Sequence, residues 1–148
     1  MTDRDAIAVT ALRAALESAI ADLTTPVQAV YLHGSWGTGW AQEESDIDLA
    51  ILAERPLGLE ERLSVFREVY AVTEGEKAID IAELLRADCV FAAQVIMKGD
   101  RILVLDKNAT DRFEMIILAK YARLNEERAG IVADICRRGT IYLTEMSV

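Results

Sequence analysis

Residues 27–52 read VQAVYLHGSWGTGWAQEESDIDLAIL, and this stretch decides the expected fold. Its first part, residues 27–32, is apolar, rich in β-branched and aromatic side chains, and follows a proline, which is typical of a strand. Gly34 lets the backbone turn tightly and approach a phosphate, and Ser35 supplies a hydroxyl and an N–H as donors. The stretch therefore predicts a strand that leads into a phosphate-binding turn.

Residues 45–52 predict a second strand, on which two carboxylates share one face. Side chains alternate along a strand, so Asp46 and Asp48 would point to one side and the apolar residues between and after them to the other. Neighbouring carboxylates repel each other unless a cation neutralises them. Magnesium takes oxygen ligands and is usually held by one or two carboxylates together with substrate phosphates. We therefore expect Asp46 and Asp48 to hold Mg²⁺ on a nucleoside triphosphate.

A third acidic residue, Asp80, is the one charge in the apolar segment 78–82, which predicts another short strand. Two interpretations are open for it: a partly exposed edge residue, or a member of the same polar site as Asp46 and Asp48. We expect the second. Asp80 would then take the proton of the attacking hydroxyl or hold a second metal ion.

Gly-Ser, a spacer, Asp-x-Asp and a third Asp on a neighbouring strand together resemble the signature of the polymerase-beta-like nucleotidyltransferases. Within that superfamily the chain is similar to the MNT-type antitoxins that partner HEPN ribonuclease toxins. The resemblance implies an α/β (α+β) fold with a mixed sheet of about four strands and a C-terminal helical tail. It also implies that Asp46, Asp48 and Asp80 are the catalytic residues and metal ligands, and that Gly34 and Ser35 bind the nucleotide.

The same resemblance implies a reaction and a partner: transfer of AMP from Mg-ATP to a tyrosine hydroxyl of the cognate HEPN toxin, with release of pyrophosphate. The residues themselves select neither ATP nor a protein acceptor. Two alternatives therefore stay open, a non-catalytic antitoxin that neutralises its toxin by binding, and a nucleotidyltransferase acting on a small molecule such as an aminoglycoside.

Composition sets the expected scale and surroundings. The 148 residues with 52% hydrophobic side chains predict a single domain over residues 1–148. A formal net charge of −9, with no basic block, disfavours long nucleic acid as a partner. The two cysteines, Cys89 and Cys136, have neither metal-ligand nor disulfide-framework spacing, and no apolar run approaches a bilayer span. We expect a cytoplasmic protein with reduced thiols.

The rest of the chain predicts helices around the sheet. A first helix would run to about residue 23, and a crossover helix over residues 59–72 would carry an apolar stripe made of Leu59, Leu63, Phe66 and Tyr70. Asp88 would cap a third helix that ends at Gly99, a fourth strand would cover residues 101–105, and Asn108 or Thr110 would open a last helix that runs to about residue 138.

The resemblance places all helices on one face of the sheet and leaves the other face open for the Gly-Ser turn and the three carboxylates. His33, the single histidine, is expected to be a packing residue at the end of its strand. Trp36 and Trp40 would either stack on a nucleobase or shield apolar surface.

Overall fold

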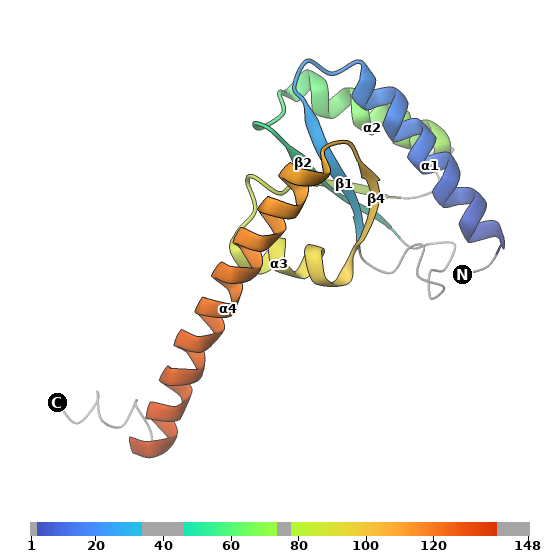
Figure 1. Ribbon diagram of the computed structural model, residues 1–148. Coiled ribbons are helices and arrows are strands. Elements are labelled where there is room, and N and C mark those ends of the chain that lie inside the picture. Colours follow the sequence, from blue (N-terminus) through green and yellow to red (C-terminus); the bar gives the residue numbers. More distant parts are fainter. Residues whose placement is uncertain (1–2, 34–45, 74–77, 139–148) are drawn as a thin grey trace.

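The computed structural model describes residues 3–33, 46–73 and 78–138, and it shows a four-stranded sheet with helices on both faces and one long helix leaving the body (Figure 1). The elements follow in the order α1 (Asp3–Ala21), β1 (Val27–His33), β2 (Ile47–Ala53), α2 (Leu59–Thr73), β3 (Ile79–Glu83), α3 (Cys89–Lys98), β4 (Asp100–Val104) and α4 (Lys107–Arg138). The expected α/β class, with a mixed sheet and a C-terminal helix, is confirmed.

The strand order is β3-β2-β1-β4. β1 is antiparallel to both of its neighbours, whereas β2 and β3 are parallel and are joined through the crossover helix α2. A parallel pair needs such a crossover, and the helix supplies it. The sheet therefore brings β1, β2 and β3, the strands that carry or precede the candidate site residues, next to one another.

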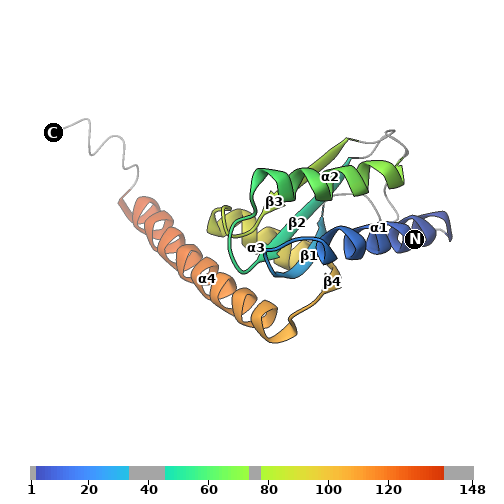
Figure 2. The same cartoon turned by 90° about the horizontal axis from the view of Figure 1, so that it is seen from above.

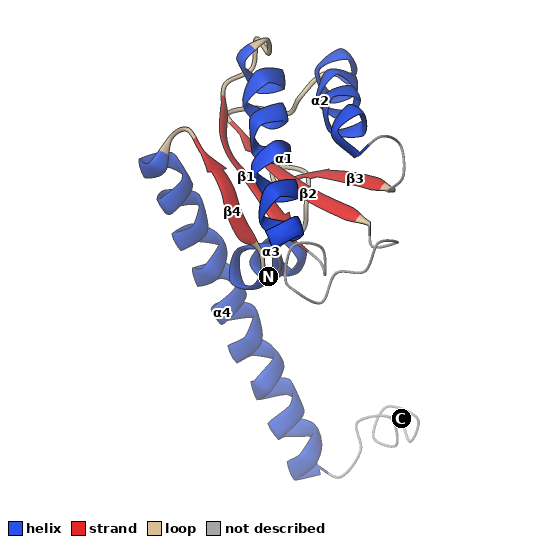
Figure 3. Cartoon of the chain, turned by 90° about the vertical axis from the view of Figure 1, so that its right-hand side faces the viewer, coloured by secondary structure: helices blue, strands red, loops and turns tan. Residues whose placement is uncertain are grey.

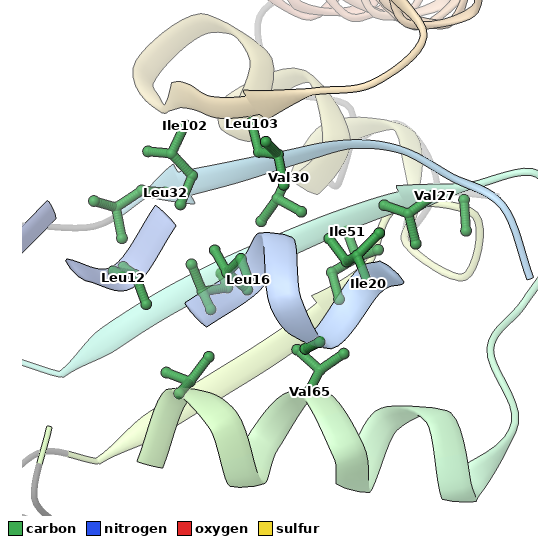
Figure 4. Packing of buried hydrophobic residues seen from close by; sticks show 14 of the residues in the cluster. Leu12, Leu16, Ile20, Val27, Val30, Leu32, Ile51, Val65, Ile102 and Leu103 are labelled. Atoms are coloured by element: carbon green, nitrogen blue, oxygen red, sulfur yellow. The ribbon is translucent and has the colours of Figure 1, made fainter. Parts of the chain in front are cut away.

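One face of the sheet packs on α1 and α2, which lie side by side (Figure 3). The buried residues of this main core come from both helices and from all strands except β3, whose Ile79 and Ile81 are only partly buried against it. Figure 4 labels ten of them: Leu12, Leu16, Ile20, Val27, Val30, Leu32, Ile51, Val65, Ile102 and Leu103. Alternation along the strands explains this pattern, since every second residue of β2 faces these helices.

The other face is not open as expected, because α3 and the first turns of α4 cover part of it. Their core is built from Ala29, Tyr31, Ala50, Leu52, Leu84, Ala92 and Val95, with Phe113 and Ile117 packed against it. Large apolar side chains on this face need cover, and placing all helices on one face would have left them in water. The expectation of helices on one face only is therefore wrong.

Helix α2 buries a different stripe from the expected one. Val65 and Val69 are fully buried against the main core, whereas Leu59, Phe66 and Tyr70 are exposed, and the Phe66 and Tyr70 rings stack on each other with centroids 5.9 Å apart. The valines lie on the neighbouring face of the same helix. Both stripes have helical spacing, so periodicity alone did not identify the one that faces the sheet.

The ends of α3 follow the prediction, and the start of α4 does not. Asp88 caps α3 by accepting a hydrogen bond from the Phe91 amide at 2.8 Å, and Gly99 ends the helix. α4 begins at Lys107, because the Asp106 carboxylate caps it and accepts from the Ala109 amide at 3.0 Å. Aspartate is a preferred cap, and it precedes the two residues that were expected to open the helix.

Candidate active site

His33, Asp48 and Asp80 form a row across three adjacent strands, and we call its two aspartates the carboxylate row. In the register of the sheet, His33 of β1 pairs with Asp48 of β2, and Asp48 pairs with Asp80 of β3. Directly paired residues of neighbouring strands lie on the same face, about 5 Å apart. The sheet therefore brings together two of the three predicted carboxylates at the end of β1 that leads to Gly34.

The alternation of β2 holds Asp48 on this face. Ile47, Leu49 and Ile51 are fully buried in the main core, so the residue between the first two must point to the opposite side. Asp48 is half-buried there, and Asp46, directly before the strand, is exposed. A one-residue slip of β2 would place the carboxylate in the core, so burial of its neighbours fixes the register.

The same reasoning applies to β3. Ile79 and Ile81 pack against the main core, and Asp80 between them is exposed. Asp80 is thus an exposed residue of an edge strand, as one interpretation expected, and its register with Asp48 also agrees with the other, that it faces the same site.

The surroundings of Asp48 disfavour the charged form of its carboxylate when no cation is bound. Burial raises the pKa of Asp48 above its ordinary value, the charge of His33 opposes that rise, and the neighbouring Asp80 and Asp46 add to it. Within residues 3–33, 46–73 and 78–138, the carboxylates of Asp46, Asp48 and Asp80 make no hydrogen bond and no ion pair. The site holds accumulated negative charge that the described side chains leave unneutralised.

This donor set suits a magnesium ion that arrives with its nucleotide. Among the described residues, no group of three or more His, Cys, Asp or Glu side chains is arranged as a metal cage. Magnesium does not require one, because it keeps several waters and is held by one or two carboxylates together with substrate phosphates. Hard carboxylate oxygens without an ion-pair partner among the described residues fit Mg²⁺ in this way, and Asp48 with its neighbours Asp46 and Asp80 are the groups that would hold it.

His33 packs as expected and also has a position that the sequence did not indicate. Its ring meets Phe91 of α3 edge-on, with centroids 5.7 Å apart and an interplanar angle of 86°, and its buried Nε2 has no hydrogen-bond partner within the described part of the chain. Because side chains alternate along a strand, His33 lies on the same face of β1 as Tyr31, and this alternation could have placed it on the face that carries Asp48. His33 therefore connects the carboxylate row to α3.

A groove of about 460 Å³ lies beside this histidine. His33 lines it together with five residues of α3 and the cap residue of that helix, namely Val90, Phe91, Gln94, Val95, Lys98 and Asp88. Gly99 allows the close approach of α3 and β1 here, because a Cβ on it would lie 2.6 Å from the Val95 carbonyl oxygen and 3.1 Å from that of Leu32. His33 thus borders the groove and is also the register partner of Asp48.

Gly34 and Ser35, predicted to bind phosphate, and Trp36 and Trp40 lie outside the described residues. The observation that bears on Gly34 and Ser35 is that β1 ends at His33, directly before them and opposite Asp48.

Two further expectations concern the chain as a whole. Over the described residues, no helix combines the length and the apolarity that a membrane crossing requires. Cys89 and Cys136 are both free thiols, the first half-buried and the second exposed.

Comparison with known proteins identifies the family. The model of the family described as Polymerase beta, Nucleotidyltransferase matches residues 18–108, more than half of the chain. The protein adenylyltransferase MntA of Shewanella oneidensis is 27% identical over 109 residues, which cover 74% of this chain and 76% of that protein.

Solved structures share the fold. A chain of a toxin–antitoxin crystal structure with AMP-PNP superposes with a TM-score of 0.67 at 24% identity, covering 84% of this chain and 98% of that one. A chain from the complex of tri-AMPylated Shewanella oneidensis HEPN toxin with MNT antitoxin gives a TM-score of 0.63 at 23% identity, covering 89% and 98%. With its matched span running from α1 through the carboxylate row to the start of α4, the chain belongs to the polymerase beta nucleotidyltransferase family.

Proposed function

We propose that this protein is an antitoxin-type adenylyltransferase that moves AMP from Mg-ATP to a tyrosine hydroxyl of a cognate HEPN ribonuclease toxin and releases pyrophosphate. The observation that carries the proposal is the register that pairs Asp48 with Asp80 at the end of β1 preceding Gly34 and Ser35. The acceptor class comes from the relatives, one of which is a protein adenylyltransferase and another a complex with an AMPylated HEPN toxin.

Each residue has a role in this reaction. The backbone after Gly34 and the Ser35 hydroxyl would hold the outer phosphates of ATP, and Asp46 and Asp48 would hold the magnesium ion that accompanies them. When bound, Mg²⁺ neutralises phosphate charge and makes the α-phosphorus more electrophilic. Asp80, paired with Asp48 and exposed, would accept the proton of the attacking hydroxyl or serve as a further metal ligand.

The bonds of the transfer balance without another reactant. The acceptor oxygen forms a bond to the α-phosphorus, the bond from that phosphorus to the β-phosphate oxygen breaks in line, and pyrophosphate leaves. The tyrosine proton passes to Asp80 and from there to solvent. The chain contributes position and charge, which is how most of the catalysis in nucleotide transfer is achieved.

The proposal is tested with the purified chain, its neighbouring gene product, ATP and magnesium, followed by intact-mass spectrometry of both proteins. We expect the neighbour to gain the mass of one or more AMP groups, the Asp48→Asn variant to add none, and the exposed Asp22→Asn variant to match the wild type. An unmodified neighbour, under conditions in which the wild type binds ATP, would refute the proposal.

The two alternatives have their own outcomes in the same experiment. If Asp48→Asn adds no AMP and still neutralises the toxin fully, binding alone is the function. If AMP appears on an aminoglycoside and not on the protein, the chain is a small-molecule nucleotidyltransferase. A cytoplasmic location is part of the proposal, because ATP and a ribonuclease target are found there and both thiols are free.

A further inference from the structure

Helix α4 continues past the body with the same face that packs on the sheet. Thr110 is fully buried, and Phe113 and Ile117 pack against the core formed with α3. After Ile117, residues on the same side of the helix recur at alternating spacings of four and three. We call these residues the α4 stripe: Tyr121, Leu124, Arg128, Ile131 and Ile135. This spacing keeps all members on one side of a helix and is the pattern by which helices pack along one another.

The α4 stripe is only partly covered: Tyr121, Leu124 and Ile135 are half-buried, and Arg128 and Ile131 are exposed. The last hydrogen bond that ties α4 to the rest of the described residues joins the Cys89 thiol to the Ile117 carbonyl oxygen at 3.7 Å, and from there the helix extends away from the body (Figure 2). Farther along, the described ion pairs all join residues of α4 itself, such as Arg138 with Asp134 at 3.3 Å, and Ile131 is 57% exposed. Helices gain most of their stability in water from packing, and within residues 3–33, 46–73 and 78–138 this stripe lacks a helix that packs along it.

The direction of α4 takes the stripe toward the active-site end of the sheet. The Thr110 hydroxyl lies 3.4 Å from the Gln28 carbonyl oxygen near the start of β1, and the Glu114 carboxylate accepts from the Tyr31 hydroxyl at 2.6 Å farther along that strand. α4 thus runs the same way as β1, which ends at His33. The stripe, about 20 Å long from Tyr121 to Ile135, lies beyond that end.

The charges on α4 indicate what kind of partner covers it. From Lys120 to Arg138 the helix has five Lys or Arg against three Asp or Glu, in a chain of formal net charge −9. Arg128 sits in the middle of the stripe, and its guanidinium has no ion pair or hydrogen bond within the described residues. A basic residue at such a central position favours a partner that presents an acidic one.

A second copy of this chain does not fit that requirement. The apolar residues of the stripe lie at nearly equal distances on both sides of Arg128. When two copies of α4 pair so that their apolar residues meet, Arg128 therefore faces Arg128 whether the two helices are parallel or antiparallel. Like charges facing each other at a packed interface are unfavourable, and two strongly acidic bodies would also be brought together. A second copy of this chain is therefore not the occupant that these charges favour.

We propose that the α4 stripe docks a helix of the acceptor protein, apolar along one side and with a carboxylate opposite Arg128; this rests on the proposed function, in which that protein is the toxin. Docking there holds the acceptor beside the end of the sheet that carries the carboxylate row. The interaction raises the local concentration of the acceptor hydroxyl and leaves the chemistry to the active site.

The test uses the full chain and the purified product of its neighbouring gene. We expect the double variant Leu124→Glu/Ile131→Glu to weaken binding by roughly 30-fold or more, as loss of a central apolar contact does. Arg128→Ala, which removes one exposed charge without touching the fold, should weaken binding by about tenfold. The control Ala133→Glu adds one glutamate, where the double variant adds two, to the opposite face of α4 and should bind like the wild type.

Circular dichroism and thermal melting show whether each variant keeps its helix content. The docking proposal would be overturned if the double variant bound with wild-type affinity, or if Ala133→Glu weakened binding as much as the double variant does. It would also be overturned if the wild type did not bind the neighbouring gene product, or if the wild type formed a homodimer that the double variant loses. Asp48→Asn should bind normally while transferring no AMP. A wild type that binds through the stripe but adds no AMP would refute the proposed reaction alone, so the two failures are distinguishable.

Discussion

Replacing Asp48 with asparagine should stabilise the metal-free protein while removing its activity. The substitution keeps the shape of the side chain and removes a charge that burial and the neighbouring carboxylates disfavour. Adjacent strands are about 5 Å apart, at which two like charges repel by about 1–3 kcal/mol for an effective dielectric constant between that of water and about 20. Asp80 is exposed, so salt and solvent screen part of this.

We therefore expect Asp48→Asn to gain about 0.5–1.5 kcal/mol, which corresponds to a melting temperature roughly 1–6 °C higher for a chain of this size. The attraction of His33 for Asp48 opposes the gain and keeps it at this modest scale. The assay is urea or thermal unfolding in EDTA, repeated with magnesium and AMP-PNP. Magnesium with AMP-PNP should raise the melting temperature of the wild type and have little effect on the variant.

Asp22→Asn, an exposed aspartate outside the row, is the control and should change stability by less than about 0.5 kcal/mol. A variant Asp48→Asn that is less stable than the wild type in EDTA would refute the reasoning, because it would mean that the carboxylate is stabilised in the folded protein without a metal ion.

Three further substitutions test the scaffold. Gly99→Ala should cost about 1–3 kcal/mol in urea unfolding, because the new Cβ would lie 2.6 Å from the Val95 carbonyl oxygen; no cost would mean that α3 moves freely. Glu83→Ala should cost about 2–3 kcal/mol by the same measurement, since the buried carboxylate accepts the Leu57 amide at 2.7 Å, and a loss under 0.5 kcal/mol would contradict this. Two backbone amides hold the pKa of Glu61 below its usual 4.5, so its contribution to stability is present above that pH and is lost as the pH falls through the lower folded-state pKa. Glu61→Gln should therefore destabilise at pH 7 with a difference from the wild type that shrinks below pH 4.5, and a pH-independent difference would contradict the assignment.

The sequence predicted the carboxylate row because local rules act strongly there. Buried isoleucine and leucine on both sides of Asp48 leave it one face to occupy, and Ile79 and Ile81 do the same for Asp80. The cap at Asp88 was predictable for a similar reason, since an aspartate before an apolar run has a local partner in the amide three residues later.

The features that depend on tertiary packing were not predictable in this way. Helix α2 offers two apolar stripes, and only the position of the sheet decides that Val65 and Val69 are buried while Phe66 and Tyr70 are exposed. The anchoring of α4 to the sheet is a long-range network, in which the Arg101 guanidinium on β4 binds Glu114. No spacing in the sequence relates these residues.

The base of α4 illustrates how such a network acts on a single group. Burial, followed by the Glu114 carboxylate, raises the pKa of Tyr31 far above its ordinary value, so the phenol stays protonated and donates to Glu114. The same carboxylate and Asp111 bind Arg101, which keeps the first turns of the helix against the sheet. Because these contacts fix the direction of α4, they also fix where the α4 stripe emerges.

The most direct test of the central claim uses ATP radiolabelled either at the α-phosphate or at the γ-phosphate, with the purified chain, magnesium and the product of the neighbouring gene. If AMP is transferred, label from the α-phosphate enters the neighbouring protein on a tyrosine, and label from the γ-phosphate appears in pyrophosphate. With Asp48→Asn, no label enters the neighbouring protein and no labelled pyrophosphate is released. Label from the γ-phosphate on the acceptor, or no α-label on it while the two proteins are bound, would contradict the account.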